Sequence, residues 1–305
     1  MHRIRLENLP RAARGVTLIE LVVAMVLVAI VVAATIYFVY PVRQSVDLTA
    51  RAELTDIADN ALQRIRRDVR LALPNSVRVT TLGPSRFLEF LEVRAAGRYR
   101  ADGGGASVLP DCDNDDAALG QPANDQLSFD PVADRCFKTI GKLPTPPVVG
   151  DFLVLNNYGP GFAGQNAYAT AGTLNRSQIA TVGTGEAGRD RIGFAPTIFQ
   201  RALHDSPGKR FYAISGPVSY VCDTAMRTVT RYWGYPIADL QPTSFGAGSS
   251  ALIAESVSTC DFDYSLNVAP QIGLFTLRLS LEKTLSGAET ERVNLYHAVH
   301  VSNVP

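Results

Sequence analysis

The longest apolar run of the chain lies near its N-terminus. Leu21–Tyr40 holds 20 residues without a charged side chain, and only Thr35 among them is plainly polar. A helix of that length spans about 30 Å at 1.5 Å per residue, which is the thickness of the hydrocarbon core of a bilayer. The pattern predicts a transmembrane helix over residues 16–40.

Charge is distributed unevenly around this run. Residues 1–15 carry one acid, Glu7, and four arginines, Arg3, Arg5, Arg11 and Arg14. Positive charge beside a membrane span marks the side that stays in the cytoplasm. We therefore expect a single-pass protein with a cytoplasmic N-terminus and an exported, periplasmic remainder.

A second periodic segment follows Pro41. Its apolar positions recur every three or four residues, at Leu54, Ile57, Ala58, Ala61, Leu62, Ile65, Val69 and Ala72. This spacing predicts an amphipathic helix over residues 41–73, ending at Leu73 because the residue before a proline avoids the helical region. Residues 16–73 then form one rod of about 85–90 Å. The opposite face is rich in arginine and is either solvated or a contact patch for another subunit.

The remainder, residues 74–305, has the short alternating runs of an antiparallel sheet. Residues 273–284 place Leu277, Leu279 and Leu281 on one face of a strand and charged or polar residues on the other. Further strands are expected at 76–82, 86–93, 151–157, 210–215, 218–223, 227–234 and 292–303. The predicted fold class is α+β, with the long helix packed on an antiparallel sheet and with long loops at 101–125 and 157–190.

Composition narrows the function. Lys+Arg and Asp+Glu are both 29, and a net charge of zero argues against a nucleic-acid-binding protein. The four cysteines, Cys112, Cys136, Cys222 and Cys260, form no C-x-x-C pair, which disfavours zinc. In an exported domain an even count indicates two disulfides. Three connectivities are possible, and we expect Cys112–Cys136 and Cys222–Cys260 because each joins neighbours in sequence.

Candidate ligands for a metal or a reaction are few. Asp111, Asp113 and Asp115 have a spacing similar to a calcium loop, but that segment lacks the loop's glycine and its final glutamate, so a solvated loop is the favoured interpretation. His297 and His300 would lie on opposite faces of a strand. No nucleophile elbow, H-E-x-x-H pair or phosphate-binding glycine loop is present. We expect no enzyme, no cofactor and no metal.

The segment RGVTLIELVVAMVLVAI resembles the class III signal of type IV prepilins and pseudopilins. The match to the T-L-[IV]-E part of that signal consists of Thr17, Leu18, Ile19 and Glu20. The resemblance implies that residues 1–15 are a leader, that prepilin peptidase cuts between Gly15 and Val16, and that Val16 is then N-methylated, although the family usually has Phe there. It also implies that Glu20 pairs in a filament with the N-terminal amine of a neighbouring subunit. A cleaved secretory signal and a plain membrane anchor remain alternatives.

A narrower resemblance involves two other segments. Arg51–Val79 and His297–Pro305 look like the minor pilins of the mannose-sensitive haemagglutinin (MSHA) pilus, MshO type, whereas residues 100–250 show no such resemblance. The resemblance implies a minor pilin that initiates or caps pilus assembly and contributes to adhesion. Its partners would be major and minor pilins, prepilin peptidase and the inner-membrane assembly platform, and its final location the pilus at the cell surface. The alternatives are a J-type pseudopilin of type II secretion and a signal-anchored periplasmic binding protein that never polymerises.

Overall fold

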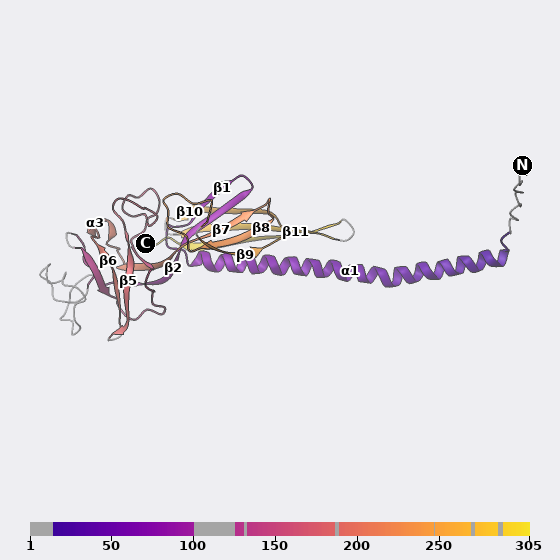
Figure 1. Cartoon of the computed structure of the whole chain (residues 1–305), viewed down its shortest axis with the longest axis horizontal. Helices are drawn as coiled ribbons and strands as arrows, with labels where there is room; N and C mark the ends of the chain where they lie inside the picture. Colours follow the sequence, from indigo (N-terminus) through magenta and orange to yellow (C-terminus); the bar gives the residue numbers. More distant parts are fainter. Residues whose placement is uncertain are drawn as a thin grey trace, which may run out of the picture. The chain divides into compact units, whose positions relative to one another are not determined.

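The computed structural model describes residues 15–100, 126–130, 133–186, 189–246, 248–269, 272–285 and 289–305 (Figure 1). The side chains of residues 39–48, 184–186 and 266–269 are not described. The chain divides into two compact units, Met1–Ala52 and Glu53–Pro305, and each is considered by itself below. Because residues 1–14 and 101–125 are not among the described residues, the expected leader lies almost wholly outside them, as do the expected loop at 101–125 and its aspartates.

Helix α1 runs from Leu18 to Arg70. The predicted helix was three residues too long at its C-terminal end, because the backbone groups beyond Arg70 have other partners. Leu71 and Ala72 donate back to residues only three positions earlier, which tightens the last turn. The backbone of residues 71–73 then bonds to strand β2, with Leu73 donating to Leu91 and Leu71 accepting from Val93, both at 2.8 Å.

A nine-stranded sheet forms much of the second unit. Its main path is β1-β2-β7-β4-β5-β6-β3, and β8 and β9 extend from β7; all pairs are antiparallel. The strands are β1 (Arg78–Leu82), β2 (Ser85–Arg98), β3 (Asp134–Lys138), β4 (Phe152–Leu155), β5 (Arg176–Glu186), β6 (Arg189–Thr197), β7 (Arg210–Asp223), β8 (Thr228–Trp233) and β9 (Ser249–Ala254). The strands expected at 218–223 and 227–234 form a hairpin, as the end of β7 and β8, with Asp223 paired to Thr228.

Strand β7 replaces two strands of the prediction. The segments 210–215 and 218–223 are continuous through Gly216 and Pro217. The first half of β7 pairs with β4 and the second half with β8, while β2 follows the other edge with register shifts near Val93. Gly216 has a φ of 131°, a conformation that favours glycine, so the strand changes neighbours without ending.

A separate three-stranded sheet has the order β10-β11-β12. Its strands are β10 (Val257–Ala269), β11 (Ile272–Thr284) and β12 (Thr290–Ser302). The predicted alternation in β11 is confirmed, because Leu277, Leu279 and Leu281 are buried while Arg278 is exposed. This sheet and the helix share one core with the nine-stranded sheet. The stripe of α1 from Leu54 to Val69 packs with β2, β7, β8, β9, β10, β11 and β12.

A second core, rich in aromatic residues, lies among β2, β3, β4, β5, β6 and β7, where Figure 1 shows β5, β6 and α3 (Arg201–His204) together at one end of this unit. Here the prediction of a loop over 157–190 is wrong from Arg176 onward, where β5 begins, while residues 157–175 contain no helix or strand. Its inward positions include Ser177, buried with its hydroxyl donating to the carbonyl of Ala195, and Ile179. Small polar residues on the buried face made this strand resemble a loop in the sequence.

Candidate functional site

The start of helix α1 is built by Thr17 and Glu20. The carbonyl of Thr17 accepts the first helical hydrogen bond, from Leu21 at 3.1 Å, and its Oγ1 accepts a bond from the backbone N–H of Glu20 at 3.3 Å. This is N-capping, and threonine followed three residues later by glutamate is the sequence of a capping box. The acid in the first turn also opposes the positive end of the helix dipole. The motif therefore has a local structural role that the sequence reading overlooked.

Gly15 stands just before this cap. A Cβ added there would meet nothing within 4 Å in the described residues. Packing within this structure thus gives no reason for a glycine at position 15. A requirement for glycine at that point would have to come from a partner that acts on the chain, such as a processing enzyme.

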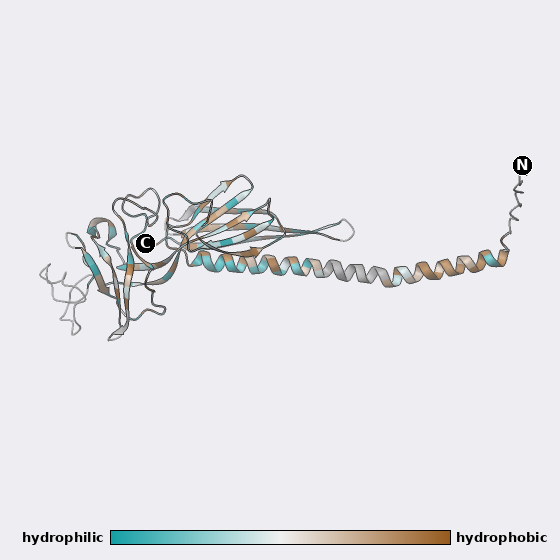
Figure 2. Cartoon of the chain, viewed as in Figure 1, coloured by the Kyte–Doolittle hydropathy of each residue, from teal (hydrophilic) through white to brown (hydrophobic). Residues whose placement is uncertain are grey.

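The segment after the cap is apolar on every side. Leu18–Phe38 spans 21 residues with a mean hydropathy of 2.9, and its most hydrophobic stretch is not buried by any other part of the described chain. Figure 2 shows the same segment as the most continuous hydrophobic stretch of α1. Uncovered apolar surface of this extent needs a lipid or protein environment. Length and composition both fit a single membrane span.

One face of this segment forms a shallow apolar hollow of about 530 Å³ with Glu20 at its N-terminal end. Its lining follows a helical stripe of Val16, Glu20, Leu21, Ala24, Met25, Val28, Ala29 and Val32. Small residues such as Ala24 and Ala29 let another helix approach closely. The hollow therefore suits helix packing, and the carboxylate of Glu20 lies beside it.

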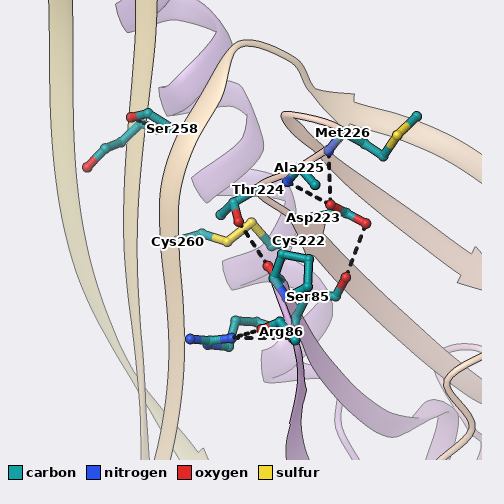
Figure 3. The surroundings of a disulfide bond; sticks show 12 residues. Ser85, Arg86, Cys222, Asp223, Thr224, Ala225, Met226, Ser258 and Cys260 are labelled. Atoms are coloured by element: carbon teal, nitrogen blue, oxygen red, sulfur yellow. Dashed lines mark hydrogen bonds between the residues drawn. A yellow bond between two sulfur atoms is a disulfide. The ribbon is translucent and has the colours of Figure 1, made fainter.

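A disulfide bond lies within the second unit of the chain. The structure joins Cys222 on β7 to Cys260 on β10, as expected from the sequence, with their Cα atoms 6.5 Å apart (Figure 3). Asp223 follows in the β7–β8 turn and accepts bonds at 2.9 Å from the backbone N–H groups of Ala225 and Met226. The disulfide thus ties the nine-stranded sheet to the three-stranded sheet. The other expected pairing involves Cys112, which lies outside the described residues.

Among the described residues, no group of three or more His, Cys, Asp or Glu side chains is placed so that it could hold a metal ion. His297 is half-buried and His300 exposed on β12, on opposite faces as predicted. Asp111, Asp113 and Asp115, the weak calcium candidate, lie outside the described residues, so that expectation remains untested. Buried titratable groups such as Asp68 and Glu89 have protein partners and belong to the packing of the fold.

The two segments used for the narrower resemblance meet in space. Asn75, which follows the end of α1 with a φ of 61°, donates its backbone N–H to Oδ1 of Asn303 at 3.2 Å. Its side chain donates to the carbonyls of Asn157 at 2.8 Å and Asn303 at 3.3 Å. Tyr264 also donates to Oδ1 of Asn303 at 3.0 Å. The helix exit and the C-terminus are thus held together by amide side chains.

The comparison with protein families places the N-terminal geometry in a known context. Residues 10–36 match the prokaryotic N-terminal methylation motif. The chain carries a pilin-like N-terminal signal. No curated protein matches the chain, and no solved structure does. The match supports the pilin and pseudopilin class, and together with the apolar helix it fits a membrane-anchored single-pass protein.

Proposed function

We propose that this chain is the precursor of a filament subunit of the type IV pilin class. Prepilin peptidase removes residues 1–15 by cutting between Gly15 and Val16, and Val16 is then N-methylated. The apolar helix anchors the subunit in the bacterial inner membrane with its N-terminus cytoplasmic and its globular unit periplasmic. The same helix afterwards lines the core of a filament. The proposal assigns the chain no catalytic residue and no cofactor.

The observation that carries this proposal is the coincidence of three features in one stretch. The methylation motif over residues 10–36 coincides with an uncovered apolar helix and with a carboxylate in that helix's first turn. A plain anchor would explain the apolar length, but a charged group beside a membrane span is costly and needs a reason. Pairing of Glu20 with the N-terminal amine of a neighbouring subunit supplies that reason, and a buried pair of this kind sets register.

The finer proposal is a minor pilin of the MSHA type that helps to initiate or cap the pilus, with adhesion as a further role. Its support is the resemblance of Arg51–Val79 and His297–Pro305 to that type, together with a mature length of 290 residues, about twice that of abundant major pilins. Its partners would be the other pilins, prepilin peptidase and the assembly platform, with no nucleic acid. A J-type pseudopilin of type II secretion is the rival from the same superfamily, and neighbouring genes would separate the two.

The experiment that tests the class is mass spectrometry of the mature N-terminus from the native membrane. We expect a chain that begins with N-methylated Val16. A chain that begins at Met1 would refute the proposal and favour the signal-anchored periplasmic protein. A chain cut within or after the apolar run would instead indicate a secretory signal.

A further inference from the structure

A hollow lies on the surface of the second unit, where the long loop between β4 and β5 (residues 157–175) meets α3. Its volume is about 490 Å³, which is within the range of about 300–1,000 Å³ that is usual for small-ligand pockets. The lining comes from residues 161–173 and from Leu203 of α3, and most of it is glycine or alanine. None of the lining residues is charged. The hollow is therefore suited to a neutral ligand.

The long loop has no helix or strand, yet side-chain hydrogen bonds hold it in one conformation. Asn157 donates to the carbonyl of Pro74 at 2.7 Å and accepts from the backbone N–H of Ala167 at 2.8 Å. Asp239 accepts from the backbone N–H of Thr170 at 3.0 Å. A loop of this length without secondary structure is uncommon in a compact domain and is often functional. Because it is already ordered, ligand binding would not have to fix its conformation.

The two sides of the hollow are joined to each other. Gln165 donates to the carbonyl of Leu203 at 2.7 Å, and Nε2 of His204 lies 2.7 Å from the carbonyl of Gly164. Gly164 has a φ of 76°, and a Cβ added there would lie only 2.8 Å from Cδ1 of Leu203. Glycine thus permits the close approach of the loop to α3, which fixes the width of the hollow.

Several polar groups in and beside the hollow are free to bind a ligand. Oδ1 of Asn166 accepts from the backbone N–H of Tyr168 at 3.1 Å, whereas its Nδ2 has no partner among the described residues, and neither has the hydroxyl of Thr173. Asn156 is 6% exposed and donates to the carbonyl of Leu203 at 2.6 Å, but its Oδ1 has no partner in the described part of the chain. Buried polar atoms normally have a hydrogen-bond partner. A ligand that carries hydroxyl groups could both donate and accept here.

An aromatic surface borders the same hollow. Phe162 lines it and is 53% exposed, and the neighbouring Tyr158 is 39% exposed, with the two ring centroids 5.6 Å apart. The face of an aromatic ring is negative, so it attracts the weakly positive C–H groups on the flat face of a sugar ring. An exposed aromatic ring beside unused donors and an uncharged lining is the combination that recognises a carbohydrate.

We propose that the hollow binds a neutral saccharide with flat, equatorially substituted rings, such as a β-linked glucan. One ring face lies against Phe162, and the hydroxyl groups bond to Nδ2 of Asn166 and to the hydroxyl of Thr173. A charged saccharide is disfavoured because no cation lines the hollow to pair with its carboxylate. The inference gives a ligand class to the adhesive role in the proposed function, and it rests on that function only for display of the hollow outside the cell.

The test titrates cellotetraose, a neutral β-linked glucan, into the full chain purified in a detergent that has no sugar headgroup. Saturation transfer from protein to sugar is followed by NMR. We expect saturable binding with a dissociation constant on the order of 1 mM or tighter, as suits a small open site. The β-linked tetraglucuronate, which has the same backbone with a carboxylate on each ring, should bind at least about tenfold more weakly. Absence of saturable binding of cellotetraose, or equal binding of the charged sugar, would overturn the inference.

Variants locate the binding in the hollow. Phe162→Ala should weaken it about tenfold, and Thr173→Val and Asn166→Asp should each weaken it about two- to tenfold. Asn166→Asp keeps the oxygen that accepts from the loop backbone, and Thr173→Val keeps the side-chain shape, so both should unfold at the original temperature. Ala171→Trp fills the hollow and should abolish binding. The control is Tyr296→Ala, which removes a 60% exposed ring on β12, outside the hollow, and should change nothing.

Unchanged affinity in the hollow variants would place the sugar elsewhere and overturn the inference. Mass spectrometry of the N-terminus in the same preparations keeps the two proposals distinguishable. A chain that is cut after Gly15 but does not bind cellotetraose would remove the saccharide site alone. An uncut chain that binds would support the site and count against the filament function.

Discussion

Asp68 of helix α1 accepts a hydrogen bond from Nε of Arg231 on β8 at 2.8 Å, and the two side chains are only 5% and 9% exposed. The hydroxyl of Tyr220 donates to the same oxygen of Asp68 at 2.7 Å. Arg231 also reaches Glu92 on β2 at 3.1 Å. Burial together with the Asp68 charge raises the pKa of Tyr220, so this hydroxyl stays a donor. The network fastens the last turns of the helix to the sheet.

Replacing Arg231 by Met should lower the free energy of unfolding by up to about 3–5 kcal/mol, because it leaves the buried Asp68 with only the more exposed Arg64 as a cation. Tyr220→Phe removes one hydrogen bond to a charged group and should cost about 1.5–3 kcal/mol. Chemical denaturation of the full chain in detergent measures both. Arg292→Gln, which breaks a more exposed pair with Glu282, is the control and should cost less than about 1 kcal/mol. A loss for Arg231→Met no larger than this control would contradict the prediction.

Glu89 on β2 lies at the centre of a second buried network. It is 1% exposed, pairs with Arg78 and accepts a bond from Tyr235 at 3.0 Å. Arg78 also lies 3.6 Å from the centre of the Tyr168 ring. Burial raises the pKa of Glu89 above its usual 4.5, an effect that outweighs the opposing influence of Arg78. A carboxyl that is harder to ionise in the folded state than in the unfolded state favours folding most at low pH.

The stability due to Glu89 should therefore be fully present below pH 4.5 and be lost as pH rises through the folded pKa. Glu89→Gln removes this titration while keeping an acceptor for Tyr235. As pH rises through that window, the unfolding free energy of the original chain should fall relative to that of the variant. Denaturation series at several pH values measure this difference. A difference that stays constant with pH would refute the assignment.

His204 provides a pH response of the opposite sign. Its ring is fully buried, its Nδ1 accepts a bond from the backbone N–H of Gln200 at 3.0 Å, and its Nε2 lies 2.7 Å from the carbonyl of Gly164. This arrangement requires the neutral ring with its proton on Nε2. Burial lowers the pKa of His204 below 6.5, although the hydrogen bond to Gly164 and the charge of Asp130 act in the other direction.

The contribution of His204 to stability should be present above pH 6.5 and be lost as pH falls through the lowered pKa, because protonation places a donor against the N–H of Gln200. Hydrogen exchange at Gly164 and in α3 should accelerate over that range. In the variant His204→Gln, hydrogen exchange at these positions should change less over the same pH range. His300→Gln, at an exposed site on β12, serves as the control and should behave like the original chain.

The sequence predicted the parts of the fold in which burial and hydrophobicity coincide. The stripe on α1 and the alternation of Leu277, Leu279 and Leu281 in β11 are such cases. It missed β5, where buried Ser177 is polar, and β10, where Cys260 and Phe262 face inward between outward aspartates. In both strands the side chains that fill the core are too few or too small to give a clear period of two.

Some residues of the candidate site can be predicted from the sequence, and other contacts cannot. Gly15, Thr17 and Glu20 are adjacent in sequence, so a motif reveals them. In contrast, Arg66, Arg67 and Arg70 of α1 line one groove together with His297 of β12, and no local pattern indicates which strand the helix approaches. The contact between Asn75 and Asn303 is likewise long-range. Only tertiary structure brings these residues together.

The disulfide between Cys222 and Cys260 should contribute substantially to stability because the two residues are 38 positions apart. Closing a loop of that length removes conformational freedom from the unfolded chain that corresponds to about 4 kcal/mol in the chain-entropy model. Replacing both cysteines by alanine should lower the unfolding free energy by about 2–5 kcal/mol. Denaturation with and without a reductant measures it. In the variant, adding a reductant should have a smaller effect than in the original chain, and an equal effect would contradict the assignment.

Variants at the N-terminus separate processing, helix capping and assembly. Gly15→Ala should block cleavage by prepilin peptidase, although the added methyl group meets nothing in this structure. Glu20→Ala should leave cleavage intact and reduce incorporation into filaments, because the neighbouring amine loses its partner. Thr17→Ala removes the hydroxyl that accepts from Glu20 and should cost about 1 kcal/mol of helix stability without loss of incorporation.

Glu20→Gln gives the sharpest comparison, because glutamine also serves at this position of a capping box but carries no charge. If the charge is what matters, Glu20→Gln should fail to incorporate as severely as Glu20→Ala, whereas Thr17→Ala assembles. If capping is what matters, Glu20→Gln should assemble and Thr17→Ala should fail. Immunoblots of sheared filaments, with mass spectrometry of the N-terminus in the same samples, measure incorporation and cleavage together. Normal incorporation of Glu20→Gln would therefore exclude the amine-pairing role even where cleavage after Gly15 is observed.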